Sequence, residues 1–219
     1  MTDHTAGSGH GTSSHPHHPA RTPRAEFYTY FTLIFLFAIP LSALFWALEL
    51  VRERRLPELG PFARAWRAGY QPAMQRVRSG ELGWTRIDAL HRLILDGLLP
   101  RFGLDALDEA ARQHLNQVWH RLDPWPDTLA GLHRLKSKYV LCTLSNGNLS
   151  LLTHMAKRAG LPWDCILSAE VFRAYKPDPA TYLGVAQVFE LPPEQVMLVA
   201  AHQDDLAAAR ACGLATAYI

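Results

Sequence analysis

An uncharged stretch of 22 residues, from Phe27 to Leu48, constrains this chain more than any other feature. A helix of about 20 such residues is long enough to cross the hydrocarbon core of a bilayer, which is roughly 30 Å thick. Tyr28, Tyr30 and Trp46 lie near its ends, where amphipathic aromatic side chains favour the membrane interface. The sequence therefore predicts one transmembrane helix. A secretory signal peptide fits less well because no small-residue cleavage site follows; a long buried core helix is the remaining alternative.

The residues on either side of this stretch predict its orientation. Residues 1–24 are rich in Gly, Ser, Thr, Pro and His without an apolar period, so we expect a disordered polar tail. Arginines are more numerous after the stretch than before it, and positive charge favours the cytoplasmic side. We therefore expect a single-pass protein of the inner (cytoplasmic) membrane whose C-terminal part is cytoplasmic. The arginines are Arg21 and Arg24 before the stretch and Arg52, Arg54, Arg55, Arg64 and Arg67 after it.

The segment from Arg24 to Arg67 resembles PufQ, a short single-span protein family of purple photosynthetic bacteria. The ordered polar sequence after the span carries this resemblance: Val51–Arg55, then Leu56-Pro57, then residues 60–66. The resemblance implies a role in bacteriochlorophyll synthesis and assembly of the photosynthetic apparatus. It also implies the membrane, and proteins of pigment synthesis or of photosynthetic complexes, as partners. Residues 25–67 are thus predicted to be a PufQ-like transmembrane and juxtamembrane segment.

A different pattern begins at Phe62. Apolar residues spaced three and four apart predict helices over 63–80, 85–103 and 107–122, and the prolines of residues 123–127 interrupt the helical pattern. Strand and helix patterns then alternate, which predicts a parallel sheet with right-handed crossovers. The expected strands are 138–145, 163–170, 196–201 and 214–219, and the expected helices are 148–160, 177–191 and 204–213. We therefore predict a helical cap at 62–125 and an α/β core at 126–219.

Composition excludes some classes of function. The 22 Lys and Arg nearly balance the 20 Asp and Glu, so there is no strongly basic surface to suggest nucleic-acid binding. The three Cys are too few for a disulfide framework and fit a reducing compartment. We expect neither a metal nor a cofactor.

Three motifs, in order along the chain, resemble the haloacid dehalogenase superfamily, and most closely its type II 2-haloacid dehalogenase branch. They are LSNGN at 144–148, YKPDPATY at 175–182 and the segment from Val199 to Ile219. The pair Trp66-Arg67 resembles a cap pair of that branch. The resemblance implies a Rossmann-like sheet with a cap, and a small carboxylate or halide as ligand.

The chemistry of the motif residues suggests separate roles. The Ser145 hydroxyl and the Asn146 amide suit a carboxylate oxygen, although an ordinary turn after a strand is the alternative. Lys176 suits an anionic nucleophile or intermediate, although a solvated surface lysine is common. Asp205 would anchor Lys176 or cap its helix, and Asp204 shares the capping alternative. The resemblance implies that Arg67 receives the departing halide and that Tyr182 supports the site. His202 replaces an Asn common in that branch, and either polarises a substrate or is only a polar turn residue.

The family's nucleophile is missing from the sequence. The family attacks with an Asp that ends an apolar strand and precedes a Gly-Thr turn, and covalent catalysis needs that carboxylate. Asp3 is the only Asp before Asp88, and the acids nearest the expected place are Glu49, Glu53 and Glu58. Because the missing strand lies in the middle of the family's sheet, we expect an incomplete sheet whose neighbouring strands lack a partner.

Three functions remain open. The first is a membrane-anchored PufQ-like protein fused to a dehalogenase-like domain that is inactive. The second is a membrane-tethered hydrolase of 2-haloacids or small phosphate esters, in which another acid substitutes. The third is a non-catalytic binder of small anions that uses Ser145, Lys176 and Arg67.

Overall fold

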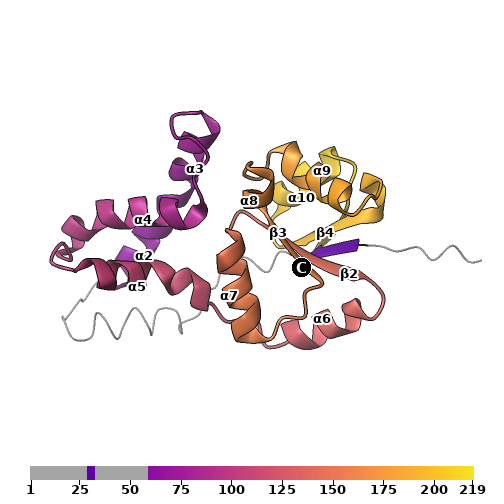
Figure 1. The fold of residues 1–219 in the computed structure, drawn as a ribbon, viewed down its shortest axis with the longest axis horizontal. Helices are drawn as coiled ribbons and strands as arrows, with labels where there is room; N and C mark the ends of the chain where they lie inside the picture. The colour runs from indigo at the N-terminus through magenta and orange to yellow at the C-terminus, as the bar shows by residue number, and fades with distance from the viewer. Residues whose placement is uncertain (1–28, 33–58) are drawn as a thin grey trace, which may run out of the picture.

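The computed structural model describes residues 29–32 and 59–219, which form a helical cap and an α/β core (Figure 1). The cap begins three residues before its predicted start at 62. Its elements are α2 (Leu59–Ala68), α3 (Tyr70–Arg78), α4 (Ile87–Leu98), the 3-10 helix η1 (Leu99–Phe102), α5 (Glu109–Asn116) and the 3-10 helix η2 (Gln117–Arg121).

The helix predicted over 63–80 is two helices that meet at Gly69. A Cβ atom on Gly69 would lie 2.5 Å from Cγ2 of Ile94, so the close approach of α4 requires glycine at this position. The helix predicted over 85–103 ends as expected at Gly103, whose φ of 66° is left-handed and suits glycine. A cluster that includes Phe62, Trp66 and Leu95 fills the interior of the cap.

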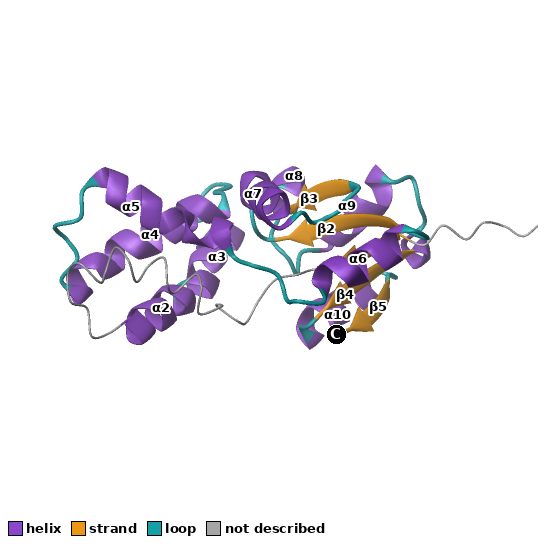
Figure 2. Cartoon of the chain, turned by 90° about the horizontal axis from the view of Figure 1, so that it is seen from below, coloured by secondary structure: helices purple, strands orange, loops and turns teal. Residues whose placement is uncertain are grey.

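The core is a parallel sheet with helices on both faces. Figure 1 shows α9 and α10 on one side of the sheet and α6 and α7 on the other, and Figure 2 shows the same sheet from below. The four predicted strands are confirmed, with slightly shorter bounds: β2 (Val140–Ser145), β3 (Cys165–Ser168), β4 (Val196–Ala200) and β5 (Ala215–Tyr218). The helices are α6 (Thr128–Lys136), α7 (Leu149–Ala159), α8 (Ala169–Phe172), α9 (Pro179–Val188) and α10 (Gln203–Ala211), with the 3-10 helix η3 (Pro193–Gln195) before β4.

The expectation that the sheet lacks its middle strand is wrong. Strand β1 (Thr29–Thr32) lies between β2 and β4, parallel to both, and the strand order is β3-β2-β1-β4-β5. Phe31 is opposite Cys142 on one side and Leu198 on the other. Thr, Tyr and Phe all favour strands, so the sequence TYFT suits this position although it lies within the uncharged stretch.

The predicted transmembrane helix therefore meets the structure at four residues only. Thr29–Thr32 form a strand there, and the rest of the stretch from Phe27 to Leu48 lies outside the described residues, as does the predicted tail at 1–24. Within the described part of the chain, no helix combines the length and the apolar character needed to cross a bilayer.

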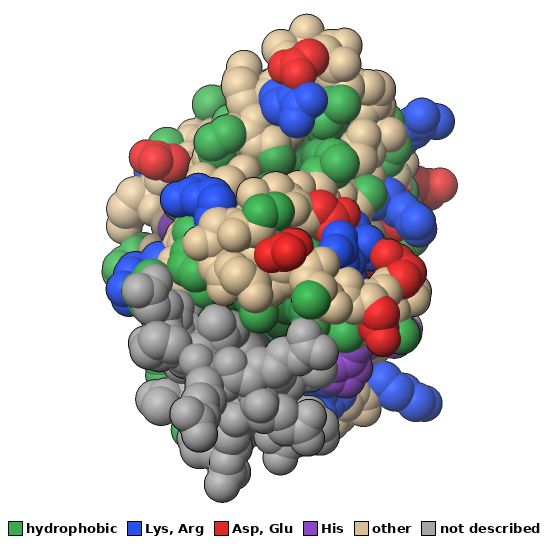
Figure 3. All heavy atoms as spheres, turned by 90° about the vertical axis from the view of Figure 1, so that its left-hand side faces the viewer, with side chains coloured by type: hydrophobic (Ala, Val, Ile, Leu, Met, Phe, Trp, Pro, Cys, Tyr) green, Lys and Arg blue, Asp and Glu red, His purple; other side chains and the backbone are tan. Residues whose placement is uncertain are grey.

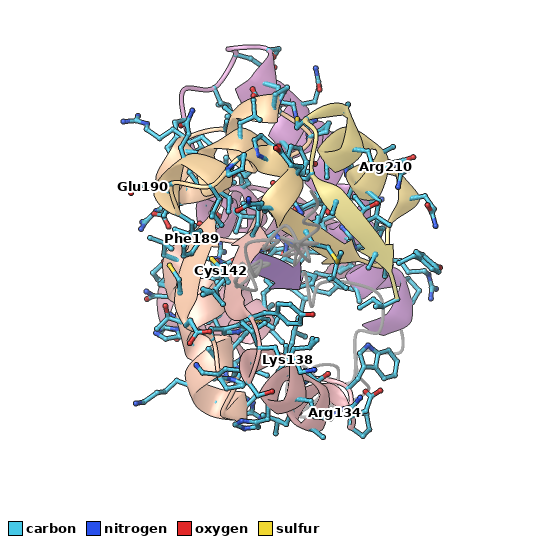
Figure 4. All side chains as sticks on the ribbon, turned by 90° about the vertical axis from the view of Figure 1, so that its right-hand side faces the viewer. Arg134, Lys138, Cys142, Phe189, Glu190 and Arg210 are labelled. Atoms are coloured by element: carbon cyan, nitrogen blue, oxygen red, sulfur yellow. The ribbon has the colours of Figure 1, made fainter. Side chains whose placement is uncertain are left out.

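Apolar side chains lie mostly in the interior of the described residues, and charged side chains lie mostly on the surface. In Figure 4 Cys142 lies inside, on β2, whereas Arg210 lies on the outside of α10, where its guanidinium donates to the hydroxyl of Thr216 over 3.1 Å. Figure 3 shows the end of the cap, where acidic and basic side chains are interspersed rather than gathered by sign. Arg92, for example, pairs with both Asp96 and Glu109, which ties α4 to α5.

Candidate functional site

A cavity of about 380 Å³ lies between the cap and the carboxyl ends of the strands, where parallel sheets bind their ligands. All seven predicted site residues line it: Arg67, Ser145, Asn146, Lys176, Tyr182, His202 and Asp205. Further lining residues that the sequence did not single out are Tyr70, Gln71, Arg78, Ile87, His91, Trp119 and Leu151. The polar residues that follow β2 and β4 are thus brought together with cap side chains.

Asp205 is the hub of the polar side of this cavity. Its Oδ2 accepts from the Lys176 ammonium over 2.7 Å, and its Oδ1 accepts from the Tyr182 hydroxyl over 2.7 Å. Lys176 is only 8% exposed; burial lowers the pKa of its ammonium, and the neighbouring Asp205 opposes that shift. Burial likewise raises the pKa of Tyr182, which stays a neutral donor. Asp205 thus anchors Lys176 rather than capping a helix, since the cap position of α10 is His202.

Ser145 and Asn146 shape the loop beside Lys176. The Ser145 hydroxyl oxygen accepts from the Gly147 amide over 3.0 Å, which is the turn interaction expected after a strand. Asn146 Oδ1 accepts from the Lys176 amide over 2.8 Å, and its Nδ2 lies 3.5 Å from the Lys176 carbonyl oxygen. Asn146 therefore holds the Lys176 backbone with both ends of its amide.

The cap contributes an arginine and an aromatic wall. The Arg67 guanidinium carbon lies 5.0 Å from the centre of the Tyr70 ring, within range of a cation–π contact. Burial lowers the pKa of Arg67, with the phenol of Tyr70 opposing that shift. Arg67 thus brings a positive charge to the cavity from the cap, and Lys176 lines the same cavity from the core.

Two further members of this wall, His91 and Trp119, were missed by the sequence argument. Their rings stack at 4.7 Å with 29° between planes, and Trp66 donates its indole N–H to the His91 carbonyl oxygen over 2.9 Å. His91 is 7% exposed, and burial lowers its pKa to about 4. Their helical spacing is also what ordinary packing within the cap would produce. The sequence therefore gives only a weak indication that they line a cavity, namely polar ring atoms on an apolar helix face.

A second polar cluster joins the cap to the core behind this wall. His120 Nε2 lies 3.0 Å from Asp88 Oδ2, and His120 Nδ1 lies 2.8 Å from Nδ1 of His154 on α7. Asn148, which precedes α7, donates to Asp88 over 2.9 Å. Burial raises the pKa of Asp88, but the hydrogen bonds with His120 and Asn148 outweigh it, so that pKa lies below its usual value. Sequence separations of 32 and more residues hid this cluster from the sequence argument.

The acids available to the cavity are few. Within the described residues its carboxylates are Asp204 and Asp205, and Asp205 is engaged as above. The same part of the chain holds no group of three or more His, Cys, Asp or Glu side chains placed to bind a metal ion. The arrangement suits binding of a small anion between Lys176, Arg67 and the Ser145 hydroxyl.

Comparison with known proteins identifies both parts of the chain. Residues 1–71 match the family described as PufQ cytochrome subunit, and residues 90–219 match the haloacid dehalogenase-like hydrolases. Protein PufQ of Rhodobacter capsulatus is 58% identical over 50 residues, which are 23% of this chain and 68% of that protein. The crystal structure of L-2-haloacid dehalogenase PA0810 is 48% identical, with a TM-score of 0.81, over 88% of this chain and 84% of that one.

The chain belongs to the PufQ family in its N-terminal part and to the haloacid dehalogenase-like hydrolases in its C-terminal part. The defluorinating L-2-haloacid dehalogenase Rha0230 is also similar, 45% identical with a TM-score of 0.76 over 81% of this chain and 72% of that one. The chain spans about half the length of the curated (S)-2-haloacid dehalogenase H-109 of Pseudomonas putida, at 52%. PufQ-like and dehalogenase-like sequences are thus fused in one chain.

Proposed function

We propose that this chain is a membrane-anchored PufQ-like protein of bacteriochlorophyll synthesis and photosynthetic-complex assembly. Its dehalogenase-like domain binds a small carboxylate or halide and does not hydrolyse 2-haloacids. One observation carries the second statement: the supporting groups of the site are paired with one another, while the sequence has no Asp between Asp3 and Asp88. The similarity of residues 1–71 to PufQ supports the first.

The chemical reason is that binding alone lowers no barrier. Lys176, Ser145 and Arg67 can hold a carboxylate, but rate comes only from interactions that are stronger in the transition state. Displacing a halide through a covalent ester requires a carboxylate nucleophile. Strand β1 and the residue after it have the sequence TYFTL, in which no side chain carries a carboxylate.

The direct test is halide release from 2-chloropropionate by the purified, detergent-solubilised full chain. We expect release no faster than from its Lys176→Ala variant, together with measurable binding of 2-chloropropionate by calorimetry that Lys176→Ala weakens. Release well above that control would overturn the proposed lack of turnover.

The PufQ-like part is tested separately in cells. In a strain that lacks its PufQ protein, the full chain and its Lys176→Ala variant should restore bacteriochlorophyll accumulation equally, because we assign this activity to the N-terminal part. Both should resist extraction from membranes by carbonate, and a reporter fused after Ile219 should be cytoplasmic. Pigment that stays at the deletion level, with the protein present in the membrane, would contradict the pigment role.

One observation favours the alternative, a membrane-tethered hydrolase of 2-haloacids or small phosphate esters. Asp204 lines the cavity next to Asp205, so it is the carboxylate best placed to substitute for the nucleophile. In that case Asp204→Asn should abolish release, while the acids nearer the N-terminus, Glu49, Glu53 and Glu58, should be replaceable by Gln without effect.

A further inference from the structure

A pair of histidines joins the cap to the core outside the cavity. His120 lies on η2, which packs against α7 of the core, and Nδ1 of His120 lies 2.8 Å from Nδ1 of His154. His120 is only 6% exposed, whereas His154 is exposed on the surface of α7. Two ring nitrogens at this distance form a hydrogen bond with room for one hydrogen atom. The bond therefore exists only while one of the facing nitrogens, and not both, carries a hydrogen.

Asp88 fixes which nitrogen of His120 carries a hydrogen. Both of its carboxylate oxygens lie near His120 Nε2, at 3.1 and 3.0 Å, and an ionised carboxylate only accepts, so Nε2 donates. Asn148 donates to the same carboxylate over 2.9 Å. Burial raises the pKa of Asp88, but these hydrogen bonds bring it below its usual value. A neutral His120 therefore presents a lone pair at Nδ1, and a neutral His154 donates to it from its own Nδ1.

The number of protons on the pair then decides the strength of the bond. A first proton binds at Nε2 of His154, the ring nitrogen that does not face His120. The resulting imidazolium still donates from Nδ1, and a charge-assisted hydrogen bond is roughly twice as strong as a neutral one. A second proton can bind only at Nδ1 of His120, so that two N–H groups face each other and the bond is lost.

We propose that the His120–His154 pair is a proton-operated latch between the cap and the core. It is tightest with one proton, is an ordinary hydrogen bond with none, and opens with two. Histidine side chains ordinarily titrate near pH 6.5, so such a pair responds to moderate changes of pH. Attachment of η2 to α7 should therefore be strongest at an intermediate pH and weaker on either side. Neither histidine lines the cavity, so the latch does not depend on the proposed function.

Other titratable and charged groups surround the pair. Helix α4 contributes His91 as well as Asp88, η2 contributes Arg121, and α7 contributes Arg158, which pairs with Asp123 over 3.0 Å. Arginine stays protonated, so Arg121 and Arg158 add a constant positive charge. Burial lowers the pKa of His91 to about 4, so His91 weakens the cap in acid by itself. The contribution of His91 must therefore be separated from that of the latch.

The test uses His154→Asn as the matched control. An asparagine amide can donate to His120 through its nitrogen or accept from it through its oxygen, so the bond survives in either protonation state and the new side chain carries no charge. Hydrogen exchange of the detergent-solubilised full chains is followed by mass spectrometry between pH 8 and pH 4.5. Protection factors for the amides of η2, corrected for the intrinsic exchange rate at each pH, are compared. The contribution of His91 cancels in the ratio, because both chains retain it.

We expect the ratio of parent to His154→Asn protection to pass through a maximum, at least about 5-fold above its value at the acidic end. His154→Ala, which offers His120 no partner, should lack this maximum and leave η2 less protected than in the parent. A ratio that stays constant with pH, or a maximum that persists in His154→Ala, would overturn the latch.

A second measurement needs no variant. Nitrogen NMR spectra of the histidine side chains in the parent chain report which ring nitrogens carry hydrogen. At pH 8 the hydrogens should be on Nε2 of His120 and on Nδ1 of His154, as the Asp88 contact requires. A hydrogen on Nδ1 of His120 at that pH would contradict the arrangement from which the latch follows.

Discussion

Strand β1 and its neighbours β2 and β4 lie in one sheet but come from different parts of the chain. β2 and β4 belong to the dehalogenase-like part, and each ends next to residues of the cavity, Ser145 in one case and His202 in the other. β1 belongs to the PufQ-like part, and Leu33 and Ile34 follow it. The gap between β2 and β4 thus requires only a chain that can form a parallel strand. The catalytic carboxylate is a separate requirement that TYFT does not meet.

Strand β1 and the predicted transmembrane helix need the same residues, Thr29–Thr32. If Thr29–Thr32 lie in the sheet, the uncharged stretch that remains, Leu33–Leu48, has 16 residues. That is short of the roughly 20 needed to cross a bilayer. We therefore expect one copy of the chain to use this stretch either to complete the sheet or to span the membrane, and the predictions below distinguish these two states.

The largest effect is expected from breaking β1. Tyr30→Pro removes a ladder donor at the residue opposite Leu141 and Met197, and proline is not tolerated within a central strand. The lost ladder bond leaves a buried acceptor unpaired, which alone costs about 1–3 kcal/mol of unfolding free energy, and the proline ring adds a steric clash within the sheet. Hydrogen exchange followed by mass spectrometry should show faster exchange in β2 and β4.

The matched control for that change is Tyr30→Val, which keeps strand propensity and should leave exchange in β2 and β4 unchanged. Membrane helices tolerate proline, and this stretch already contains Pro40. If Tyr30→Pro and Tyr30→Val exchange alike, β1 is not part of the sheet in solution and the stretch is free to span the membrane.

A comparable loss of unfolding free energy is expected from breaking the Lys176–Asp205 pair, whose two residues both lie in the dehalogenase-like part. Lys176→Ala leaves Asp205 buried without its ammonium partner, and removing one member of a buried pair costs about 3–5 kcal/mol. The double variant Lys176→Met with Asp205→Asn should recover most of that loss, because no uncompensated charge remains. Urea unfolding of all three chains measures this; equal stability of Lys176→Ala and the parent would mean that the pair is hydrated and not buried.

Particular residues show how far the sequence predicted this molecule. The runs VLCTLS and VMLVA are apolar and bounded by polar turns, so the strands of the dehalogenase-like part followed from them, and so did the gathering of Ser145 and Lys176 at one edge. The sequence could not place TYFT in the sheet, because a central strand and a membrane helix make the same demand for uncharged residues. The sequence did not indicate that His91 and Trp119 line the cavity, because aromatic residues at helical spacing are also expected in a packed cap.

A smaller effect on the unfolding free energy is expected from the titration of His91, which lies in the cap and not in the sheet. Its pKa in the folded chain is about 4 against 6.5 ordinarily, so between these values the unfolded chain binds more protons. Stability from this group is therefore complete above pH 6.5 and is lost as the pH falls towards 4. His91→Phe removes this loss, so between pH 7 and pH 5 the variant should gain about 2 kcal/mol relative to the parent.

The control for that titration is His133→Gln, which removes an exposed histidine. Urea unfolding at both pH values gives the comparison. A gain as large in His133→Gln, or none in His91→Phe, would mean that His91 is accessible to water in the folded chain and that the cap wall is loosely formed.

The smallest effect, and the sharpest comparison of strand geometry with chemistry, is expected from Leu33→Asp. Leu33 directly follows β1, and the carboxyl ends of parallel strands meet at one edge of the sheet, where Ser145 and Lys176 already lie. A carboxylate there should gain a slow nucleophilic activity, with halide release from 2-chloropropionate rising about 10-fold above the parent background, equivalent to about 1.4 kcal/mol of barrier. The gain should stay small because no Gly-Thr turn follows.

Leu33→Asn, which is similar in shape and cannot form the ester, should release nothing above background, and adding Lys176→Ala should abolish the gain. An aspartate also opposes membrane insertion, by about 2.5–3.5 kcal/mol at the centre of a span, so Leu33→Asp should favour the sheet-forming state. If Leu33→Asp and Leu33→Asn behave alike while exchange in β2 and β4 stays slow, then β1 completes the sheet without delivering its next residue to the site, and a strand of the correct register would have to replace it.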